Sequence, residues 1–451
     1  MKRFLSIVLI LTMLLALPAS WEPAFAGNDT GFDPGEVPYP EIEGASGILI
    51  DAVTGEILWE KNIHEPHYPA STTKIMTAIL AIEKLDFDDL LPVDRETAFT
   101  GGSRIYLIEG EEITVGEAMY GMMLESANDV AVALAKKMGG DVKGFAEMMN
   151  QRAKELGALN TNFVNPNGLH DKEHVSTAYD LAMMAKYAYT LPTFMEYCGT
   201  YRHTIPATNK QETRYMYNTN RLLYDTSTKV YVNGIRRTPK YDGILGMKTG
   251  WTTEARGCLV ACAERNGTTL IAVSMNSSAN GRFTDCMALM DWGFDNYQTT
   301  TVLNGGAPMG TVPVKRGSVL NVSVEASTSA LATLKLNQSL GDITMETNLF
   351  DSLQAPVSAG ETAGTVKLFL GDKFLGEYMV VTSEEIPEGG ILSRFGVDDA
   401  TASKIWRGFA IGFASLALVC CLIALYLHLM NGVQWPFQRS RRRSGTYSRY
   451  R

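Results

Sequence analysis

Ser71-Thr72-Thr73-Lys74 places a hydroxyl nucleophile and an amine three residues apart. On a helix, positions i and i+3 share a face, so the lysine amine can reach the serine oxygen. A lysine held neutral there can take the serine proton, which gives an acyl-transfer centre without histidine. Because Tyr68-Pro69-Ala70 is extended and residues 75–80 form an apolar helical run, Ser71 is predicted at a helix N-terminus, where backbone N–H groups favour an oxyanion. Taken alone, the motif also fits an N-cap serine followed by a surface lysine.

Two further groups of polar residues could complete such a centre. In Ser126-Ala127-Asn128, which lies between apolar helical segments, the hydroxyl could relay a proton and the amide could hold a substrate carbonyl. In Lys248-Thr249-Gly250, a cation beside a hydroxyl suits a carboxylate, and glycine lets a substrate backbone approach. Each also has an ordinary interpretation, a polar helix end for the first and a plain turn for the second.

The elements that must position these motifs follow from the hydrophobic pattern. A strand pair near the start is followed by a mainly helical stretch to about Tyr189, where Thr177-x-x-Asp180 is a helix-capping signal. Strand pairing then returns around Asn266-Gly267, a strong hairpin signal, and a helix over 285–297 closes the unit. The predicted strands are 46–52, 55–60, 257–263 and 268–275.

The chain is too long for one hydrophobic core, so several domains are expected. A linker at 304–308 separates the catalytic unit from a β-rich stretch, whose clearest part is a hairpin with its turn at Gly371-Asp372. The predicted parts are a signal peptide (1–26), a leader (27–42), a catalytic domain (43–298), a β-rich domain (305–382), a polar stalk (383–406), a transmembrane helix (407–430) and a basic cytoplasmic tail (431–451).

The N-terminus has the three parts of a secretory signal peptide. Lys2-Arg3 precedes an apolar run over 4–17, and Ala24-Phe25-Ala26 is a small-residue cleavage site. A first transmembrane helix is the alternative, but the run is short and ends at Pro18. Cleavage after Ala26 is therefore predicted.

A second apolar segment, residues 408–430, contains no Asp, Glu, Lys or Arg. At about 1.5 Å per residue it is roughly 34 Å long, enough to cross a bilayer core. An interfacial amphipathic helix is the alternative, but the segment lacks the charged face that such a helix needs. Arginines follow it, from Arg439 to Arg451, so the positive-inside rule predicts a single-pass protein of the cell membrane with a cytoplasmic tail and everything before Trp406 outside.

Charge and cysteine usage exclude several classes of function. The whole chain has a net charge of −9, and the ectodomain is more acidic still because residues 1–26 and the tail are positive. Nucleic acid is therefore not an expected partner. Four cysteines are exported, but Cys258 and Cys262 are too far apart along an extended strand for an easy bridge. No required disulfide framework and no cysteine metal site are predicted.

Histidine patterns carry little weight. His170 and His174 have a metal-ligand spacing, but they lie in an apparent loop and no motif places a third ligand. No Gly-x-Ser-x-Gly string is present, so a Ser-His-Asp hydrolase is not indicated. Neither a metal nor a cofactor is expected.

The three motifs, in this order, match the signature of penicillin-recognising serine enzymes. The chain resembles the low-molecular-mass penicillin-binding proteins, which are serine-type D-alanyl-D-alanine carboxypeptidases, over about residues 42–385. The resemblance implies an α/β (α+β) penicillin-recognising serine transpeptidase-like catalytic domain with an antiparallel sheet and a helical subdomain, then a small β-rich domain and a C-terminal transmembrane helix. Longer strings that match are 69–77, 165–169, 246–250 and Gly281-Arg282.

The resemblance also implies a role for each matching residue. Ser71 would attack the carbonyl between two D-alanines, Lys74 would be the base, and Ser126 would pass the proton to the leaving amine. The partners would be peptidoglycan stem peptides ending in D-Ala-D-Ala, and β-lactam antibiotics. The substrate would be bound at its amide carbonyl by Asn128, at its carboxylate by Lys248, Thr249 and Arg282, and at its oxyanion by the backbone N–H groups of Ser71 and Trp251.

Two departures from the family pattern stand out. Relatives often carry an amphipathic C-terminal anchor instead of a full span, and they often have a histidine where Trp251 stands. Two alternative functions also remain open. A β-lactamase would need a general base for deacylation, and residues 161–171 contain no glutamate, while Glu155 lies in a helical pattern. A non-catalytic wall-binding scaffold would be indicated by a changed Ser71 or Lys74, and both are present.

Overall fold

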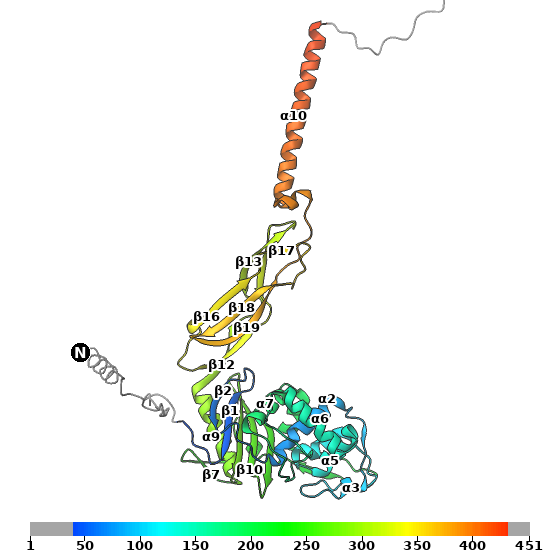
Figure 1. Cartoon of the computed structure of the whole chain (residues 1–451), viewed down its shortest axis with the longest axis vertical. Helices are drawn as coiled ribbons and strands as arrows, with labels where there is room; N and C mark the ends of the chain where they lie inside the picture. The colour runs from blue at the N-terminus through cyan, green and yellow to red at the C-terminus, as the bar shows by residue number, and fades with distance from the viewer. Residues whose placement is uncertain (1–38, 432–451) are drawn as a thin grey trace, which may run out of the picture. The chain divides into compact units, whose positions relative to one another are not determined.

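Residues 39–431 are described by a computed structural model (Figure 1). The predicted signal peptide, most of the leader and the basic tail from residue 432 lie outside the described residues. Two parts of the predicted fold class, a catalytic domain with an antiparallel sheet and helices and a β-rich domain after it, are confirmed.

The catalytic domain is built on a five-stranded antiparallel sheet. Its strands are β1 (Ser46–Asp51), β2 (Ile57–Lys61), β9 (Ile244–Thr252), β10 (Arg256–Arg265) and β11 (Thr268–Ser277), in the order β2-β1-β11-β10-β9. The predicted hairpin at Asn266-Gly267 is confirmed, because both residues have positive φ, as a tight two-residue turn requires. The order leaves β9 at the edge of the sheet.

Side chains alternate between two cores, one on each face of the sheet. Ile271 and Val273 of β11 pack with the helical region, whereas Leu270 and Ala272 pack with α9 (Gly281–Asn296). Figure 1 shows the helices gathered on one side of the sheet and α9 on the other. Because strand side chains alternate between faces, nearly continuous apolar strands can serve both cores.

The predicted helical stretch to Tyr189 is confirmed. Thr177 caps α7 by accepting a hydrogen bond from the Asp180 N–H, as its sequence signal indicates. The helices are α2 (Lys74–Lys84), α3 (Arg95–Ala98), α4 (Val115–Leu124), α5 (Asn128–Gly139), α6 (Val142–Glu155), α7 (Ala178–Tyr189) and α8 (Pro192–Gly199), with the 3₁₀ turns η1 (Ala70–Thr73) and η2 (Arg221–Leu223).

Small hairpins and the start of α9 complete this domain. The predicted start of the last helix at Asp285 is wrong, because α9 already begins at Gly281. Asp285 instead uses its carboxylate to accept hydrogen bonds from the backbone N–H groups of Glu43 and Gly44. The additional short strands pair as β3 (Leu90–Leu91) with β4 (Ile113–Thr114), β5 (Arg202–Ile205) with β6 (Arg214–Tyr217), and β7 (Val230–Val232) with β8 (Ile235–Arg237).

The β-rich region begins earlier than predicted. β12 (Tyr297–Leu303) follows α9 directly and pairs with β15 (Ala330–Lys335), so residues 304–307 form a turn within the β-rich region and the predicted linker is wrong. The predicted hairpin over β18 and β19 is confirmed. The other elements are β13 (Pro308–Lys315), β14 (Asn321–Ala326), η3 (Leu340–Asp342), β16 (Ile343–Leu349), β17 (Leu353–Gln354), β18 (Thr362–Leu370) and β19 (Lys373–Thr382).

The predicted stalk is partly folded onto the β-rich domain. Ile386 forms an antiparallel bridge with Val357 and is buried in the domain core. After this bridge come a short 3₁₀ helix, η4 (Ile391–Phe395), and the long helix α10 (Asp399–Asn431). Residues 399–430 are long and apolar enough to cross a membrane, and the helix begins eight residues before the predicted span.

Candidate active site

Ser71 lies in η1, a tight turn that leads directly into α2. Ala70 has a positive φ of 47°, so the chain turns sharply just before the nucleophile. Thr72, Thr73 and Lys74 are buried, whereas Ser71 stays partly exposed. This agrees with the predicted helix N-terminus, with one 3₁₀ turn ahead of the α-helix.

Lys74 Nζ is the centre of the hydrogen bonds in this site. It lies 3.1 Å from Ser71 Oγ, 2.7 Å from Asn128 Oδ1 and 2.7 Å from the backbone oxygen of Asn167. The last two atoms are carbonyl oxygens, which can only accept hydrogen bonds. A neutral amine has two N–H groups and one lone pair. When both N–H groups donate to these oxygens, the lone pair is left to face the Ser71 hydroxyl.

The surroundings of Lys74 favour the neutral amine. Its side chain is completely buried. Burial lowers the pKa of Lys74 well below its usual value, the positive charge of Lys248 lowers it further, and Asp129 acts in the opposite direction. A lysine in this state can accept a proton from a neighbouring hydroxyl.

Ser126 and Asn128 lie at the junction of α4 and α5. Ser126 has a φ of 61°, and its buried Oγ has no hydrogen-bond partner within residues 39–431. Asn128 donates from Nδ2 to the backbone oxygen of Gly101 at 2.8 Å, in addition to its contact with Lys74. The structure therefore joins Asn128 directly to the Ser71 and Lys74 pair, whereas Ser126 keeps an unused hydroxyl.

Asp129 is a structural residue of the site that the sequence motifs do not reveal. Its buried carboxylate accepts hydrogen bonds from the N–H groups of Ile105 and Leu107, at 3.3 and 3.0 Å. These bonds fix the loop whose Gly101 oxygen holds Asn128. Burial raises the pKa of Asp129. The available signal was an acidic residue at the start of an apolar helix, where buried carboxylates often accept backbone N–H groups.

Lys248, Thr249 and Trp251 lie on β9, the edge strand of the sheet. Lys248 is buried, and its Nζ lies 3.2 Å from the Thr249 backbone oxygen. The Thr249 hydroxyl pairs with that of Thr219 at 2.7 Å, a contact that no motif indicates. Within residues 39–431, β9 pairs with a strand on one side only, and such an edge strand can pair with an added extended peptide.

Arg282, from α9, brings a second cation to β9. Its Nη1 donates to the Gly250 backbone oxygen at 2.5 Å, and its guanidinium lies 5.9 Å from the centre of the Trp251 ring. Its buried Nε has no partner in the part of the chain that the structure describes. Burial lowers the pKa of Lys248 to about 7, and the charge of Arg282 contributes to this shift. Two partly desolvated cations therefore lie beside the edge strand, where an anion would relieve their repulsion.

The loop over residues 162–175 packs against the nucleophile turn. His174 accepts a hydrogen bond from the Val164 N–H at Nδ1, so its Nε2 carries the proton and donates to Thr73 Oγ1 at 2.8 Å. Burial lowers the pKa of His174 to about 4, which keeps the ring neutral. His174 is thus a buried structural residue. In residues 39–431 no group of three or more His, Cys, Asp or Glu side chains is arranged to hold a metal ion.

Gly168 allows this loop to approach the nucleophile turn. It has a φ of 83°, and a Cβ atom there would lie 1.8 Å from the Ala70 backbone oxygen. Only glycine fits both demands. The loop can therefore carry the Asn167 oxygen to Lys74, which the sequence string 165–169 suggested only by resemblance.

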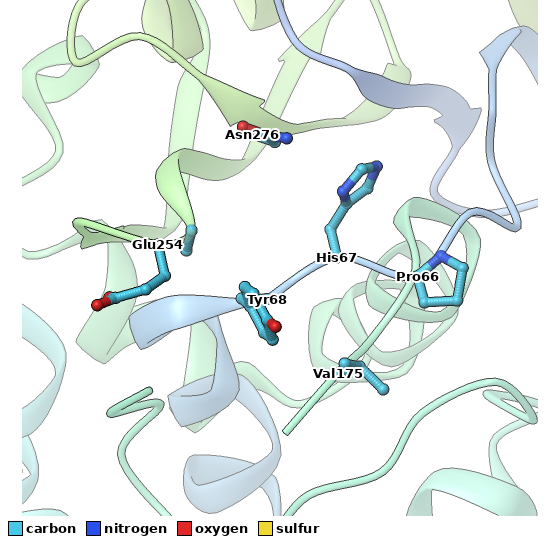
Figure 2. Close-up of a pocket in the computed structure, with 7 residues that line it drawn as sticks. Pro66, His67, Tyr68, Val175, Glu254 and Asn276 are labelled. Atoms are coloured by element: carbon cyan, nitrogen blue, oxygen red, sulfur yellow. The ribbon is translucent and has the colours of Figure 1, made fainter. Parts of the chain in front are cut away.

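A separate pocket of about 220 Å³ lies beside the site (Figure 2). It includes Tyr68, three residues before Ser71, and Glu254, three residues after Trp251. The ring of His67 points into it in Figure 2, and its Nε2 has no hydrogen-bond partner among the described residues. None of the side chains that contact Lys74 lines this pocket, so it is not part of the catalytic contacts. Its lining is Pro66, His67, Tyr68, Val175, Glu254, Ala255 and Asn276.

The four cysteines of the catalytic domain and Glu155 lie outside the contacts of the site. Cys198, Cys258, Cys262 and Cys286 are buried and free, and burial raises the pKa of each thiol. Glu155 lies at the end of α6 and pairs with Arg152 on the surface.

The sequence matches known protein families along most of its length. The sequence profile of the D-alanyl-D-alanine carboxypeptidase family, Peptidase S11, matches residues 34–279, and that of the C-terminal domain of penicillin-binding protein 5 matches residues 297–388. The second match begins where β12 begins, in agreement with the corrected start of the β-rich region.

This chain aligns with nearly the full length of individual relatives. The D-alanyl-D-alanine carboxypeptidase DacF of Bacillus subtilis is 34% identical over 87% of this chain and 97% of its own. The D-alanyl-D-alanine carboxypeptidase DacD of Escherichia coli is 31% identical over 82% of this chain and 93% of its own. Among solved structures, penicillin-binding protein 5 of Haemophilus influenzae has a TM-score of 0.64 at 28% identity and covers 78% of this chain and 100% of its own.

Proposed function

Because the chain belongs to the D-alanyl-D-alanine carboxypeptidase family of serine peptidases, we propose that it removes the terminal D-alanine from peptidoglycan stem peptides through an acyl-enzyme on Ser71. The observation that carries the proposal is the set of contacts around Lys74. Two carbonyl oxygens take its donors, and its remaining contact is the Ser71 hydroxyl.

In the acylation step, Ser71 Oγ attacks the carbonyl carbon between the two D-alanines and its proton passes to Lys74. The oxyanion is bound by the backbone N–H groups of Ser71 and Trp251. Ser126, whose buried hydroxyl is otherwise unused, passes the proton from Lys74 to the leaving amine. The C–N bond breaks, D-alanine leaves, and the shortened stem peptide remains as an ester on Ser71.

In the deacylation step, water attacks the ester carbonyl and gives a proton to Lys74. The tetrahedral intermediate collapses, the Ser71 oxygen takes the proton back, and the shortened peptide is released with a new carboxylate. Both steps use the same base and the same oxyanion donors, so one preorganised site serves the whole cycle.

The substrate is expected to bind in an extended form along the free edge of β9. The amide of Asn128, the first residue of α5, binds the substrate carbonyl. The terminal carboxylate is bound by Lys248, Thr249 and Arg282. This binding would offset the repulsion between the two cations that lowers the pKa of Lys248.

Penicillins present a reactive carbonyl and a carboxylate like those of the D-Ala-D-Ala end, so they are expected to acylate Ser71 and to leave slowly. A β-lactamase would instead need a carboxylate to activate the deacylating water. Glu155, the candidate for this base in the sequence, lies on the surface, where it forms an ion pair with Arg152 and accepts a hydrogen bond from Gln151. This placement favours the carboxypeptidase.

The same chain is proposed to be held in the cell membrane by α10, with the catalytic domain outside and the basic tail in the cytoplasm. The apolar length of residues 399–430 and the arginines that follow support this topology.

Release of D-alanine from a synthetic pentapeptide ending in D-Ala-D-Ala tests the activity and the role of Ser71 together. The wild-type protein should release one D-alanine per peptide and leave a tetrapeptide ending in D-Ala untouched. Ser71→Ala should release none. Equal release by the Ser71→Ala protein would contradict the nucleophile assignment.

A further inference from the structure

We propose that the pocket beside the site (Figure 2) binds a primary amine at the end of a long side chain, carried by the substrate residue that precedes the acylated D-alanine. The inference rests on the proposed function and names a further determinant of its substrate. In a pentapeptide that ends in D-Ala-D-Ala, this is the third residue. The pocket volume of about 220 Å³ is far more than the ~10–15 Å³ that holds one water molecule, so it has room for an aminoalkyl chain.

The proposed contacts along β9 set the direction of the substrate. Its terminal carboxylate is bound at Lys248 and Thr249, and the carbonyl that Ser71 attacks is bound at the N–H of Trp251, which comes later on the same strand. The substrate therefore runs antiparallel to β9, and its residues before the cleaved bond lie beyond Trp251. The pocket is in that direction, because Glu254, in the turn that follows β9, lines it.

The distance along β9 fits a long side chain. Glu254 is three residues after Trp251, so the two Cα atoms are at most about 10 Å apart at about 3.3 Å per residue. The substrate residue before the acylated D-alanine lies one residue, about 3.3 Å, further along the strand. A side chain with a four-carbon stem, such as that of lysine, spans about 6 Å from its Cα. Its amine can therefore reach the pocket, whereas the side chain of alanine cannot.

His67 offers an unused acceptor inside the pocket. Its side chain is only 10% exposed, its ring points into the pocket in Figure 2, and its Nε2 has no hydrogen-bond partner anywhere from residue 39 to residue 431. The Glu65 carboxylate lies 3.7 Å from Nε2, too far for a hydrogen bond. Burial lowers the pKa of His67, so the neutral ring can accept at Nε2 when its proton is on Nδ1. A ligand that donates here would satisfy a buried polar atom.

The charges around the pocket favour a cation. Glu254 lines it, and Glu65 lies beside the His67 ring. Because Glu254 is exposed, its carboxylate can turn toward a bound amine. The nearby Arg256 donates to the Asn276 backbone oxygen at 3.4 Å and is paired with another carboxylate, that of Glu43, at 3.6 Å. An ammonium would therefore meet negative charge and an unused acceptor, whereas an anion would be repelled.

Two peptides that differ by one amine test the pocket in the full-length protein. Acetyl-L-lysyl-D-Ala-D-Ala and acetyl-L-norleucyl-D-Ala-D-Ala have side chains of similar length, but only the first ends in an ammonium. The measurement is kcat/KM for D-alanine release from each peptide. The wild-type protein should have a kcat/KM about 10-fold higher for the lysine peptide, because hydrogen bonds to a charged group are stronger than neutral contacts.

Variants of two pocket residues assign this preference to the pocket. Glu254→Gln removes the charge, and His67→Phe keeps a ring but removes the acceptor. Each should lower the ratio of the two kcat/KM values to about threefold or less, and Glu254→Gln should leave the norleucine peptide unaffected. Glu264→Gln is the matched control, because Glu264 is an exposed glutamate at the other end of β10, and it should keep the wild-type ratio. Circular dichroism checks that His67→Phe is folded.

The outcomes separate this inference from the activity on which it rests. Equal kcat/KM values for the two peptides in the wild-type protein would overturn the amine site and leave the carboxypeptidase activity standing. A wild-type ratio in Glu254→Gln or in folded His67→Phe would likewise overturn the pocket as the place where the amine binds. If the folded wild-type protein releases no D-alanine from either peptide, the proposed function fails and this inference fails with it.

Discussion

Lys74 is suited to act as a base because its neighbours decide which part of the amine faces Ser71. The Asn128 and Asn167 oxygens both lie 2.7 Å from Nζ, closer than Ser71 Oγ at 3.1 Å. The Lys74 side chain has no exposed surface, so its burial opposes a charged ammonium. The same contacts explain why the residue must be a lysine. Arginine stays charged and has no lone pair to offer.

Lys74→Arg should therefore leave the chain folded but stop the chemistry. The positive charge would be permanent, so the Ser71 proton would have no acceptor. D-alanine release is expected to fall by about 10²–10⁴-fold, because a general base usually accelerates a reaction by this factor. The measurement is kcat for a D-Ala-D-Ala peptide, with circular dichroism as the folding control. Activity within threefold of wild type would contradict the role of Lys74.

The two buried lysines predict a bell-shaped pH profile of kcat/KM. Lys74 must lose its proton to act as base, so the rate should rise with pH through its lowered pKa. Lys248, with a pKa of about 7, is charged below that pH and loses its charge above it, so carboxylate binding should weaken as the pH rises. A peptide ending in an amide should lose the falling limb and keep the rising one. An unchanged falling limb with the amide would contradict the role of Lys248.

Arg282→Ala should weaken recognition of the terminal carboxylate. A hydrogen bond to a charged group contributes about 1.5–3 kcal/mol, so kcat/KM should fall about 10- to 100-fold. The loss should appear mainly in KM, and the amide-ended peptide should be affected little. Arg282→Lys is the conservative control, since it keeps the charge but not the forked geometry. Equal losses for both peptides would point to a structural role through Gly250 instead.

At the residue scale, the sequence motifs indicated the side chains but not their backbone partners. Ser71, Lys74, Asn128 and Lys248 were predicted because three motifs occur together in one order, and the structure brings Ser71 and Asn128 to the Lys74 amine. The Asn167 oxygen could not be predicted, because any residue supplies a carbonyl and only the folded loop places this one. Thr219 was missed for a similar reason, since a single threonine carries no signal until β9 brings Thr249 beside it.

At the scale of elements, the loop over 162–175 is what completes the site. Two hydrogen bonds fix this loop. His174 donates to Thr73 Oγ1, and the Thr77 hydroxyl donates to the Pro166 oxygen at 2.6 Å. Hairpins with a strong turn signal, such as β10–β11, could be predicted from the sequence. The start of α9 could not, because Asn280-Gly281 resembles a turn until Asp285 pairs with residues far away along the chain.

Gly168→Ala should damage both stability and activity. The methyl group would meet the Ala70 oxygen and the residue would be forced to keep a positive φ. A loss of about 2–4 kcal/mol in the free energy of unfolding is expected, with slower acylation. Gly157→Ala is the matched control, because Gly157 has a φ of 80° but no atom within 4 Å of the added Cβ. It should cost about 1 kcal/mol. Equal losses for the two variants would show that the close approach at Gly168 has no importance.

At the scale of the whole molecule, the catalytic sheet and helices, the β-rich region and the long apolar helix follow one another as predicted, but their boundaries differ from the predicted ones. The apolar segment near the C-terminus is evident from sequence because membrane spans depend on length and hydropathy alone. The predicted stalk was partly wrong because Ile386 looks like one apolar residue in a polar stretch until Val357 pairs with it. Likewise, β12 becomes a strand of the β-rich region only through its pairing with β15.

Truncation after Lys404 should release an active enzyme from the membrane. The catalytic contacts lie entirely within residues 71–282, so D-alanine release should stay close to that of the full chain. The measurement is the partition of activity between the membrane and soluble fractions after alkaline washing. Retention of the truncated protein on membranes at wild-type levels would show that α10 is not the main anchor.

The central claim, that Ser71 is the acylated nucleophile of a slowly deacylating D,D-peptidase, is tested most directly by trapping it. The full-length protein would be incubated with a fluorescent penicillin, digested, and the labelled peptide identified by mass spectrometry at successive times. The account predicts one adduct, on Ser71, that persists for minutes. An adduct on another residue, or no adduct on folded protein, would contradict the assignment of the nucleophile. A Ser71 adduct that vanishes within seconds would make the protein a β-lactamase.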